Sequence, residues 1–257
     1  MTGQVPGSVR VLLNAVFDYA GLFPPAALDM NTAVNNYAAH RRSPWAWMLG
    51  KFVVPASRLD EFAKATSESW PVTVVADVAP RYRGLVVESI ETKATTVEEI
   101  ARADASPVTT YFEIPVTPDP RELVQALAKA NARAKVRVGD RDAVATADLA
   151  RFIIRCAEAG VSFKATAGLH HPLPTMRQHG FLNVLLAAPI AWAGATLDAL
   201  MAVLDAEAFA FDDDGVACCG HRLSNEQLQQ TRERLAISIG SCSFEEPVNE
   251  LDHAIRH

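Results

Sequence analysis

Hydrophobic and polar positions change their spacing repeatedly along the chain. From about residue 48 to residue 168, short runs rich in β-branched and aromatic residues alternate with segments of helical periodicity. This alternation is typical of repeated βα units around a parallel sheet. One further apolar run precedes this region and another follows it. The predicted strands are 16–23, 50–56, 71–78, 84–91, 109–116, 134–139, 162–168 and 235–243.

Capping residues mark several helices between these strands. Ser57, Thr95 or Thr96, and Thr146 each stand ahead of a helical pattern. A short polar side chain there can accept a hydrogen bond from a free backbone N–H of the first helical turn. Gly160 follows the third of these patterns and is expected to end that helix in a left-handed conformation.

The connection between the seventh and eighth predicted strands is longer than the others. It begins with an apolar helical stretch, 181–204, which Pro189 is expected to break or kink. The segment AFAFDDDGVACC follows, and its Asp-Gly turn between apolar runs predicts a β-hairpin. We interpret this hairpin as an excursion before the last strand. Eight strands alternating with helices in about 250 residues predict a closed (β/α)₈ barrel, a TIM barrel, as one domain over 1–257.

The composition favours a protein that binds neither nucleic acid nor membranes. The 257 residues are 49% hydrophobic, the net charge is −6, and no block of lysine or arginine is present. No uninterrupted apolar run reaches the roughly 18 residues needed for a membrane span, and no signal peptide is evident. We therefore expect a cytoplasmic protein. The four cysteines form no spaced framework, so reduced thiols are expected.

Two lysines on neighbouring predicted strands are the main chemical feature. Lys135 lies in AKVRVGD and Lys164 in VSFKATAGL, and each precedes a glycine, Gly139 or Gly168, by four positions. Adjacent ammonium groups lower each other's pKa. Lysine becomes a nucleophile when its pKa falls from about 10.4 toward about 7 or 8. The pair therefore predicts Schiff-base chemistry; the alternative is that each lysine reaches solvent or pairs with a carboxylate.

Other polar side chains are expected near these lysines, at the strand ends where a TIM barrel holds its active site. Arg137 and Thr166 each lie two positions after one of the lysines. Ser241 and Ser243 are also two positions apart, so each pair shares one face of its strand. Carboxylates in the earlier strands would act as proton shuttles or ion-pair partners. They are Asp18, Glu88, Glu91 and Glu113, and Asp18 is also expected to contact substrate.

Several segments, in order, resemble the deoxyribose-phosphate aldolase group of class I aldolases. The similar segments are FDYAGLFPP, FVVPASRLDEFAKA, FEIP, AKVRVGD, FKATAGL and SIGSCSF. The resemblance implies that Lys135 forms an imine with a small carbonyl substrate and that Lys164 lowers its pKa. It implies no metal or other cofactor, because a protonated imine is itself an electron sink.

The resemblance also implies roles for other residues. Glu113 matches the family's fifth-strand glutamate, and Glu91 lies near its fourth-strand relay aspartate. The family's phosphate site would correspond to Gly139, Gly168, Gly240, Ser241 and Ser243.

The sequence departs from the family at the substrate-contacting positions. Arg137 replaces a small residue, and a guanidinium suits bidentate recognition of a carboxylate or phosphate. The loop after the seventh strand differs, and its His170 or His171 could serve as an acid or base near neutral pH. The substrate is therefore not expected to be deoxyribose phosphate itself.

Two other classes of function remain open. A metal-dependent hydrolase or isomerase would use Glu113, His170, His171 and an aspartate to hold a divalent ion, with Lys164 binding substrate charge. A non-catalytic barrel would bind a small acidic metabolite through both lysines.

Three smaller features have mainly structural interpretations. Zinc bound by Cys218, Cys219 and His221 is disfavoured by their spacing. The acidic turn 212–214 is expected to be a solvated hairpin tip rather than a cation site. Trp45 and Trp47 indicate packing or homo-oligomer contacts rather than a nucleotide stack.

Overall fold

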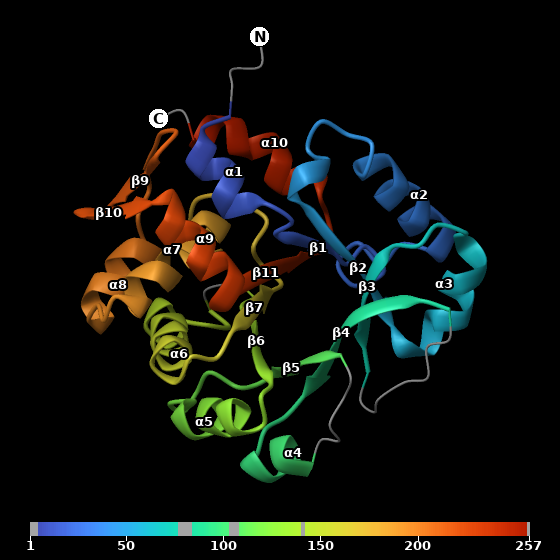
Figure 1. The fold of residues 1–257 in the computed structure, drawn as a ribbon, viewed down its shortest axis with the longest axis horizontal. Coiled ribbons are helices and arrows are strands. Elements are labelled where there is room, and N and C mark those ends of the chain that lie inside the picture. The colour runs from blue at the N-terminus through green and yellow to red at the C-terminus, as the bar shows by residue number, and fades with distance from the viewer. Residues whose placement is uncertain (1–4, 77–83, 103–107, 140–141, 256–257) are drawn as a thin grey trace.

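The computed structural model describes residues 5–76, 84–102, 108–139 and 142–255, which form a closed barrel surrounded by helices (Figure 1). Its eight strands are parallel and run in the order β1-β11-β7-β6-β5-β4-β3-β2 around the barrel. The predicted (β/α)₈ fold is confirmed. The strands are β1 (Phe17–Tyr19), β2 (Leu49–Pro55), β3 (Pro71–Val75), β4 (Val86–Lys93), β5 (Thr109–Glu113), β6 (Arg133–Arg137), β7 (Phe163–Thr166) and β11 (Ala236–Ser241).

Among the described residues a helix follows each barrel strand except β3, and the helices form the outer layer in Figure 1. The α-helices of the described residues are α1 (Gly7–Leu13), α2 (Met30–His40), α3 (Leu59–Ala65), α4 (Val97–Arg102), α5 (Arg121–Lys129), α6 (Thr146–Ala159), α7 (Phe181–Trp192), α8 (Leu197–Leu204), α9 (Asn225–Arg234) and α10 (Glu245–Ala254). Two short 3₁₀ turns, Ala46–Met48 and Ala56–Arg58, flank β2.

The predicted helix ends are partly right. Thr96 caps α4, since its hydroxyl accepts a hydrogen bond from the Glu99 N–H at 3.2 Å. Gly160 ends α6 with a φ of 64°, as expected. Ser57 is not an N-cap, because it lies inside a 3₁₀ turn that precedes α3. Thr146 is the first residue of α6 rather than its cap.

The hydrophobic core lies between the strands and the helices. Phe52 of β2 stacks on Phe62 of α3 with ring centroids 4.9 Å apart, and Tyr37 of α2 packs against Trp70 at 4.9 Å. Apolar side chains that face outward on the strands therefore pack against the helices. The opposite face of several strands carries charged side chains into the barrel, which is where the site lies.

The long connection between β7 and β11 holds three helices, α7, α8 and α9, and a separate sheet. The predicted hairpin is present as β8 (Ala210–Phe211) and β9 (Gly215–Cys218), and a third antiparallel strand, β10 (His221–Ser224), extends it. Pro189 does not break the helix where expected, because α7 continues to Trp192 before α8 begins.

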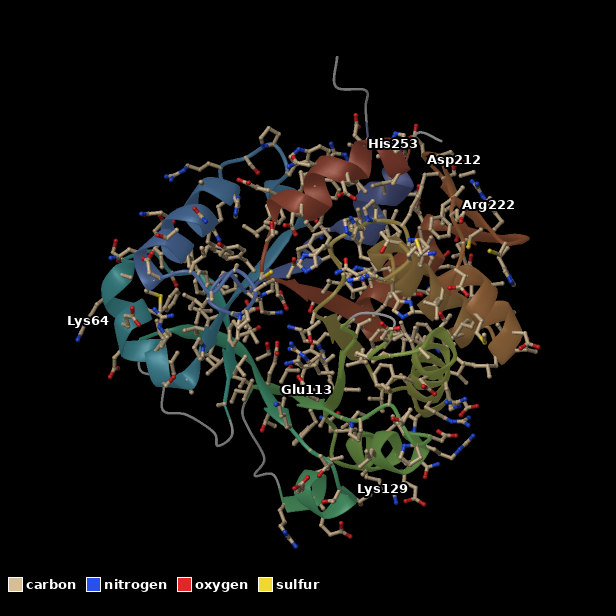
Figure 2. The ribbon with its side chains drawn as sticks, turned by 180° about the vertical axis from the view of Figure 1, so that it is seen from behind. Lys64, Glu113, Lys129, Asp212, Arg222 and His253 are labelled. Carbon is tan, nitrogen blue, oxygen red and sulfur yellow. The ribbon has the colours of Figure 1, made fainter. Side chains whose placement is uncertain are left out.

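The acidic turn of this hairpin is engaged by protein groups. The Asp212 carboxylate lies 2.7 Å from the Arg222 guanidinium (Figure 2), and it accepts hydrogen bonds from the N–H groups of Asp214 and Gly215. The Asp213 carboxylate accepts the Gly7 N–H at 2.9 Å, which ties the turn to the start of α1.

Candidate active site

Lys164 of β7 is sealed inside the barrel between two carboxylates. Its Nζ lies 2.7 Å from Asp18 Oδ2 and 2.5 Å from Glu91 Oε1, and its side chain is 1% exposed. The Tyr111 ring lies 5.5 Å from the same ammonium. Asp18 is held in turn by the Ser238 hydroxyl at 2.9 Å and by the backbone N–H of Lys51 at 2.9 Å. Lys164 is therefore fully surrounded by protein.

Lys135 of β6 is the register partner of Lys164 and of Glu113 on β5. Its Nζ lies 2.7 Å from Glu91 Oε2 and 3.0 Å from Glu113 Oε2. Because the two lysines contact different oxygens of Glu91, one carboxylate links both ammonium groups. The Lys135 side chain is 10% exposed and borders the cavity described below.

Burial and charge act in opposite directions on this cluster. Burial alone would raise the pKa of Asp18 and of Glu91, but the nearby lysine charges outweigh it and hold both pKa values below their usual ranges. Burial alone would lower the pKa of Lys164, but Asp18 and Glu91 raise it above its usual range. All three groups are therefore ionised near neutral pH.

A cavity of about 320 Å³ opens at the carboxyl ends of the strands, above this cluster. Glu113, the last residue of β5, lies near the centre of the barrel in Figure 2 and borders the cavity. The sequence-predicted residues that line it are Glu91, Glu113, Lys135, Arg137, Thr166, Gly168, His170 and Gly240. Most of the predicted strand-end residues are thus brought together.

Other predicted site residues lie outside the described lining of this cavity. Asp18 is buried around Lys164 and was wrongly expected to contact substrate. Ser241 and Ser243 bind each other, since the Ser241 hydroxyl donates to the Ser243 carbonyl at 2.6 Å. The backbone of Gly139 packs against Gly168. A Cβ added to Gly168 would lie 1.7 Å from the Gly139 carbonyl oxygen.

The two histidines of the β7 loop face α10. His170 borders the cavity and its Nδ1 lies 2.8 Å from Glu246, whereas His171 lies 2.8 Å from Glu250 and outside the cavity. The predicted metal set with Glu113 is therefore not assembled. In the part of the chain that the structure describes, no three His, Cys, Asp or Glu side chains are grouped to hold a metal ion. This also applies to Cys218, Cys219 and His221.

Sequence reasoning missed several residues of the site. Lys93 ends β4 two positions after Glu91, so strand alternation alone could have identified it. Ser238 alternates in the same way with Gly240 on β11. The apolar and small residues of the cavity wall carried no comparable signal. They are Ala20, Phe23, Pro24, Pro25, Val53, Val75, Ala167 and Cys242.

The fold and the site together define a TIM barrel with a charged cavity at the carboxyl ends of its strands, a fold that is commonly enzymatic. No protein-family model matches the chain, and no curated protein matches its sequence significantly. Within the described residues, none of the helices combines the length and apolar character needed to cross a membrane.

Proposed function

We propose that the protein is a cofactor-independent Schiff-base enzyme, a lyase of the class I aldolase kind or a related isomerase or cyclase. Its substrate is a small carbonyl compound, and Lys135 is the nucleophile. The observation that carries this proposal is the position of the Lys135 ammonium. It borders the cavity, and two carboxylates lie within 3.0 Å of it.

The two lysines have different roles in this proposal. Lys164 cannot reach a substrate, because its side chain is 1% exposed and enclosed by Asp18 and Glu91. It supplies a fixed positive charge instead. Because Lys164 also contacts Glu91, that carboxylate keeps one of its two ammonium partners when Lys135 loses its proton.

This division differs from the direct repulsion expected from the sequence. There, Lys164 was predicted to act on Lys135 as a like charge beside it. In the structure, Glu91 contacts both ammonium groups, so the two lysines interact with a shared carboxylate. The activation of Lys135 by Lys164 stays a prediction.

Glu113 serves as the proton shuttle. Lys135 transfers a proton to Glu113, 3.0 Å away, and the neutral amine adds to the substrate carbonyl carbon. The resulting carbinolamine takes a proton and loses water to give the protonated imine. That imine accepts the electron pair of an adjacent C–C bond, which breaks as the hydroxyl on the departing carbon loses its proton and that carbon becomes a carbonyl. Alternatively it accepts the pair of a C–H bond whose proton leaves. In both cases the imine becomes an enamine. Reprotonation and hydrolysis restore the amine.

Borohydride trapping tests this proposal. The protein is incubated with a panel of small aldehydes, ketones and 2-oxo acids, reduced, and examined by intact mass and peptide mapping. We expect one adduct on Lys135, lost in Lys135→Met and strongly reduced in Lys164→Met. Lys129→Met is the matched control, because Lys129 lies on the outer face of α5, away from the cavity (Figure 2).

Two results would contradict the proposal. An adduct that survives in Lys135→Met would assign the nucleophile to another lysine. No adduct with any carbonyl, combined with saturable binding of small acids, would favour a barrel that binds an acidic metabolite without turning it over.

A further inference from the structure

Arg137 has a different environment from the other charged residues of the site. It is the last residue of β6, two positions after Lys135, and it borders the same cavity. Its guanidinium makes no hydrogen bond or ion pair with any residue that the structure describes, and its side chain is exposed. By contrast, Lys135 and Lys164 each contact two carboxylates.

The charges around the cavity do not balance. Its walls and the cluster beneath them hold four cations, Lys93, Lys135, Arg137 and Lys164, and three carboxylates, Asp18, Glu91 and Glu113. His170 lies 2.8 Å from Glu246, so that carboxylate already has a neighbour. Lys93, Lys135 and Lys164 each have a carboxylate within 4.0 Å, whereas Arg137 has none among the described residues. A ligand carboxylate would supply the missing partner of Arg137.

We infer that Arg137 binds a carboxylate of the substrate, so that the substrate is a small oxo acid with one carboxylate. This inference rests on the proposed function for the carbonyl end. A planar guanidinium matches a carboxylate with two parallel hydrogen bonds. Successive residues on one face of a strand are about 6.6 Å apart, so long side chains at 135 and 137 can hold two ends of one small molecule.

A phosphate monoester fits this site less well. It carries about −1.5 to −2 charges at neutral pH, more than the single charge of Arg137 can balance. The hydroxyls that would help to bind it are also engaged elsewhere. Ser241 donates to the carbonyl of Ser243, and the Ser243 hydroxyl accepts the N–H of Glu246.

The test compares matched carbonyl compounds in the borohydride assay. Pyruvate and 4-oxobutanoate are each paired with their methyl ester, and dihydroxyacetone phosphate is the phosphorylated probe. For wild type we expect an acid to reach half-maximal trapping at a concentration about 10- to 100-fold below that of its ester, the range for a hydrogen-bonded ion pair. In Arg137→Met this preference disappears, and in Arg137→Lys it is only partly retained.

The outcomes separate the inference from the proposed function. Equal trapping of acid and ester in wild type would retain the imine and overturn the carboxylate site. A preference for the phosphorylated ketone that depends on Arg137 would also overturn it. If no compound is trapped, the proposed function fails, and calorimetric titration with pyruvate and 4-oxobutanoate decides the inference. Binding of either acid that Arg137→Met weakens at least about 10-fold would support it, and binding unchanged by that substitution would overturn it.

Discussion

Glu91 is the residue on which the charge balance of the site depends. Its two oxygens bind the ammonium groups of Lys164 and Lys135, and its side chain is 3% exposed. Removal of any one member would leave a buried charge with one partner fewer, which is more destabilising than the absence of a whole pair. The same side chains therefore influence both the stability of the barrel and the charge beside the cavity.

Lys164→Met tests this coupling. The substitution leaves Asp18 and Glu91 buried with one fewer counter-charge, and we expect it to lower the free energy of unfolding by about 3–5 kcal/mol. Urea unfolding followed by circular dichroism measures the change. Lys93→Met is the control, because its ammonium lies 4.0 Å from Glu113 and is 75% exposed, and we expect it to change stability by less than about 1 kcal/mol. Equal effects of the two substitutions would contradict the structure.

The sequence was sufficient to identify most charged members of the site but not their partners. Lys135, Lys164, Glu91 and Glu113 were all predicted, because charged residues within apolar strands are recognisable. Which carboxylate binds which lysine depends on the register between strands, and no single strand encodes that. Asp18 was wrongly expected to contact substrate for the same reason.

At the level of elements, Gly139 and Gly168, the glycines that follow β6 and β7, are in close backbone contact. Gly168 has a φ of 67°, and an added Cβ would overlap the Gly139 carbonyl oxygen. Both loops follow the strands that carry the two lysines. A change in their separation would therefore move Lys135 relative to the cavity.

Gly168→Ala and Gly160→Ala separate this contact from backbone strain. Gly160 has a φ of 64° and open space around the Cβ position, so its substitution adds only the left-handed strain of about 1–2 kcal/mol. Gly168→Ala adds overlap with the backbone, and we expect a further loss of about 1–3 kcal/mol together with reduced trapping on Lys135. Thermal or urea unfolding of both variants measures the difference. Equal stabilities would mean that the loops separate freely.

The strands were more predictable than the helix ends. All eight barrel strands fall within the predicted segments or overlap them, because their β-branched runs are distinct from helical periodicity. The end of β7 was placed too late, since Ala167 and Gly168 have positive φ and leave the strand. Ser57 was misassigned because a 3₁₀ turn precedes α3, and polar residues at such a turn look the same in sequence as caps.

The whole molecule is closed by β1 and β11, the first and last strands of the barrel. The Asp18 carboxylate on β1 accepts a hydrogen bond from the Ser238 hydroxyl on β11. In addition, the Gly7 N–H at the start of α1 donates a hydrogen bond to Asp213 in the hairpin turn. Asp18 belongs to the buried charge cluster, so the cluster helps to join the first strand to the last. Its ionisation therefore influences the stability of the entire barrel.

Stability should decline on both sides of neutral pH. Asp18 and Glu91 have lowered pKa values in the folded state, so their contribution is complete above about pH 4.3, the ordinary glutamate value, and is lost as the pH falls through their folded pKa values. Lys164 has a raised pKa, so its contribution is complete below about pH 10.4 and is lost as the pH rises further.

Urea unfolding from pH 2 to pH 11 measures this dependence. Glu91→Gln should flatten the decline on the acid side, since the glutamine carries no proton to gain. The exposed Glu122→Gln should retain the wild-type profile. An acid limb unchanged by Glu91→Gln would show that other carboxylates dominate it.

The buried charge cluster also bears on when the barrel can fold relative to its synthesis. Asp18 leaves the ribosome 146 residues before Lys164 and 220 residues before Ser238. At about 5–20 residues per second, a nascent chain carries this aspartate without either partner for many seconds. We therefore expect no stable half-barrel to form around it during translation. We expect the barrel and its buried lysine cluster to be assembled together, after β11 has been synthesised.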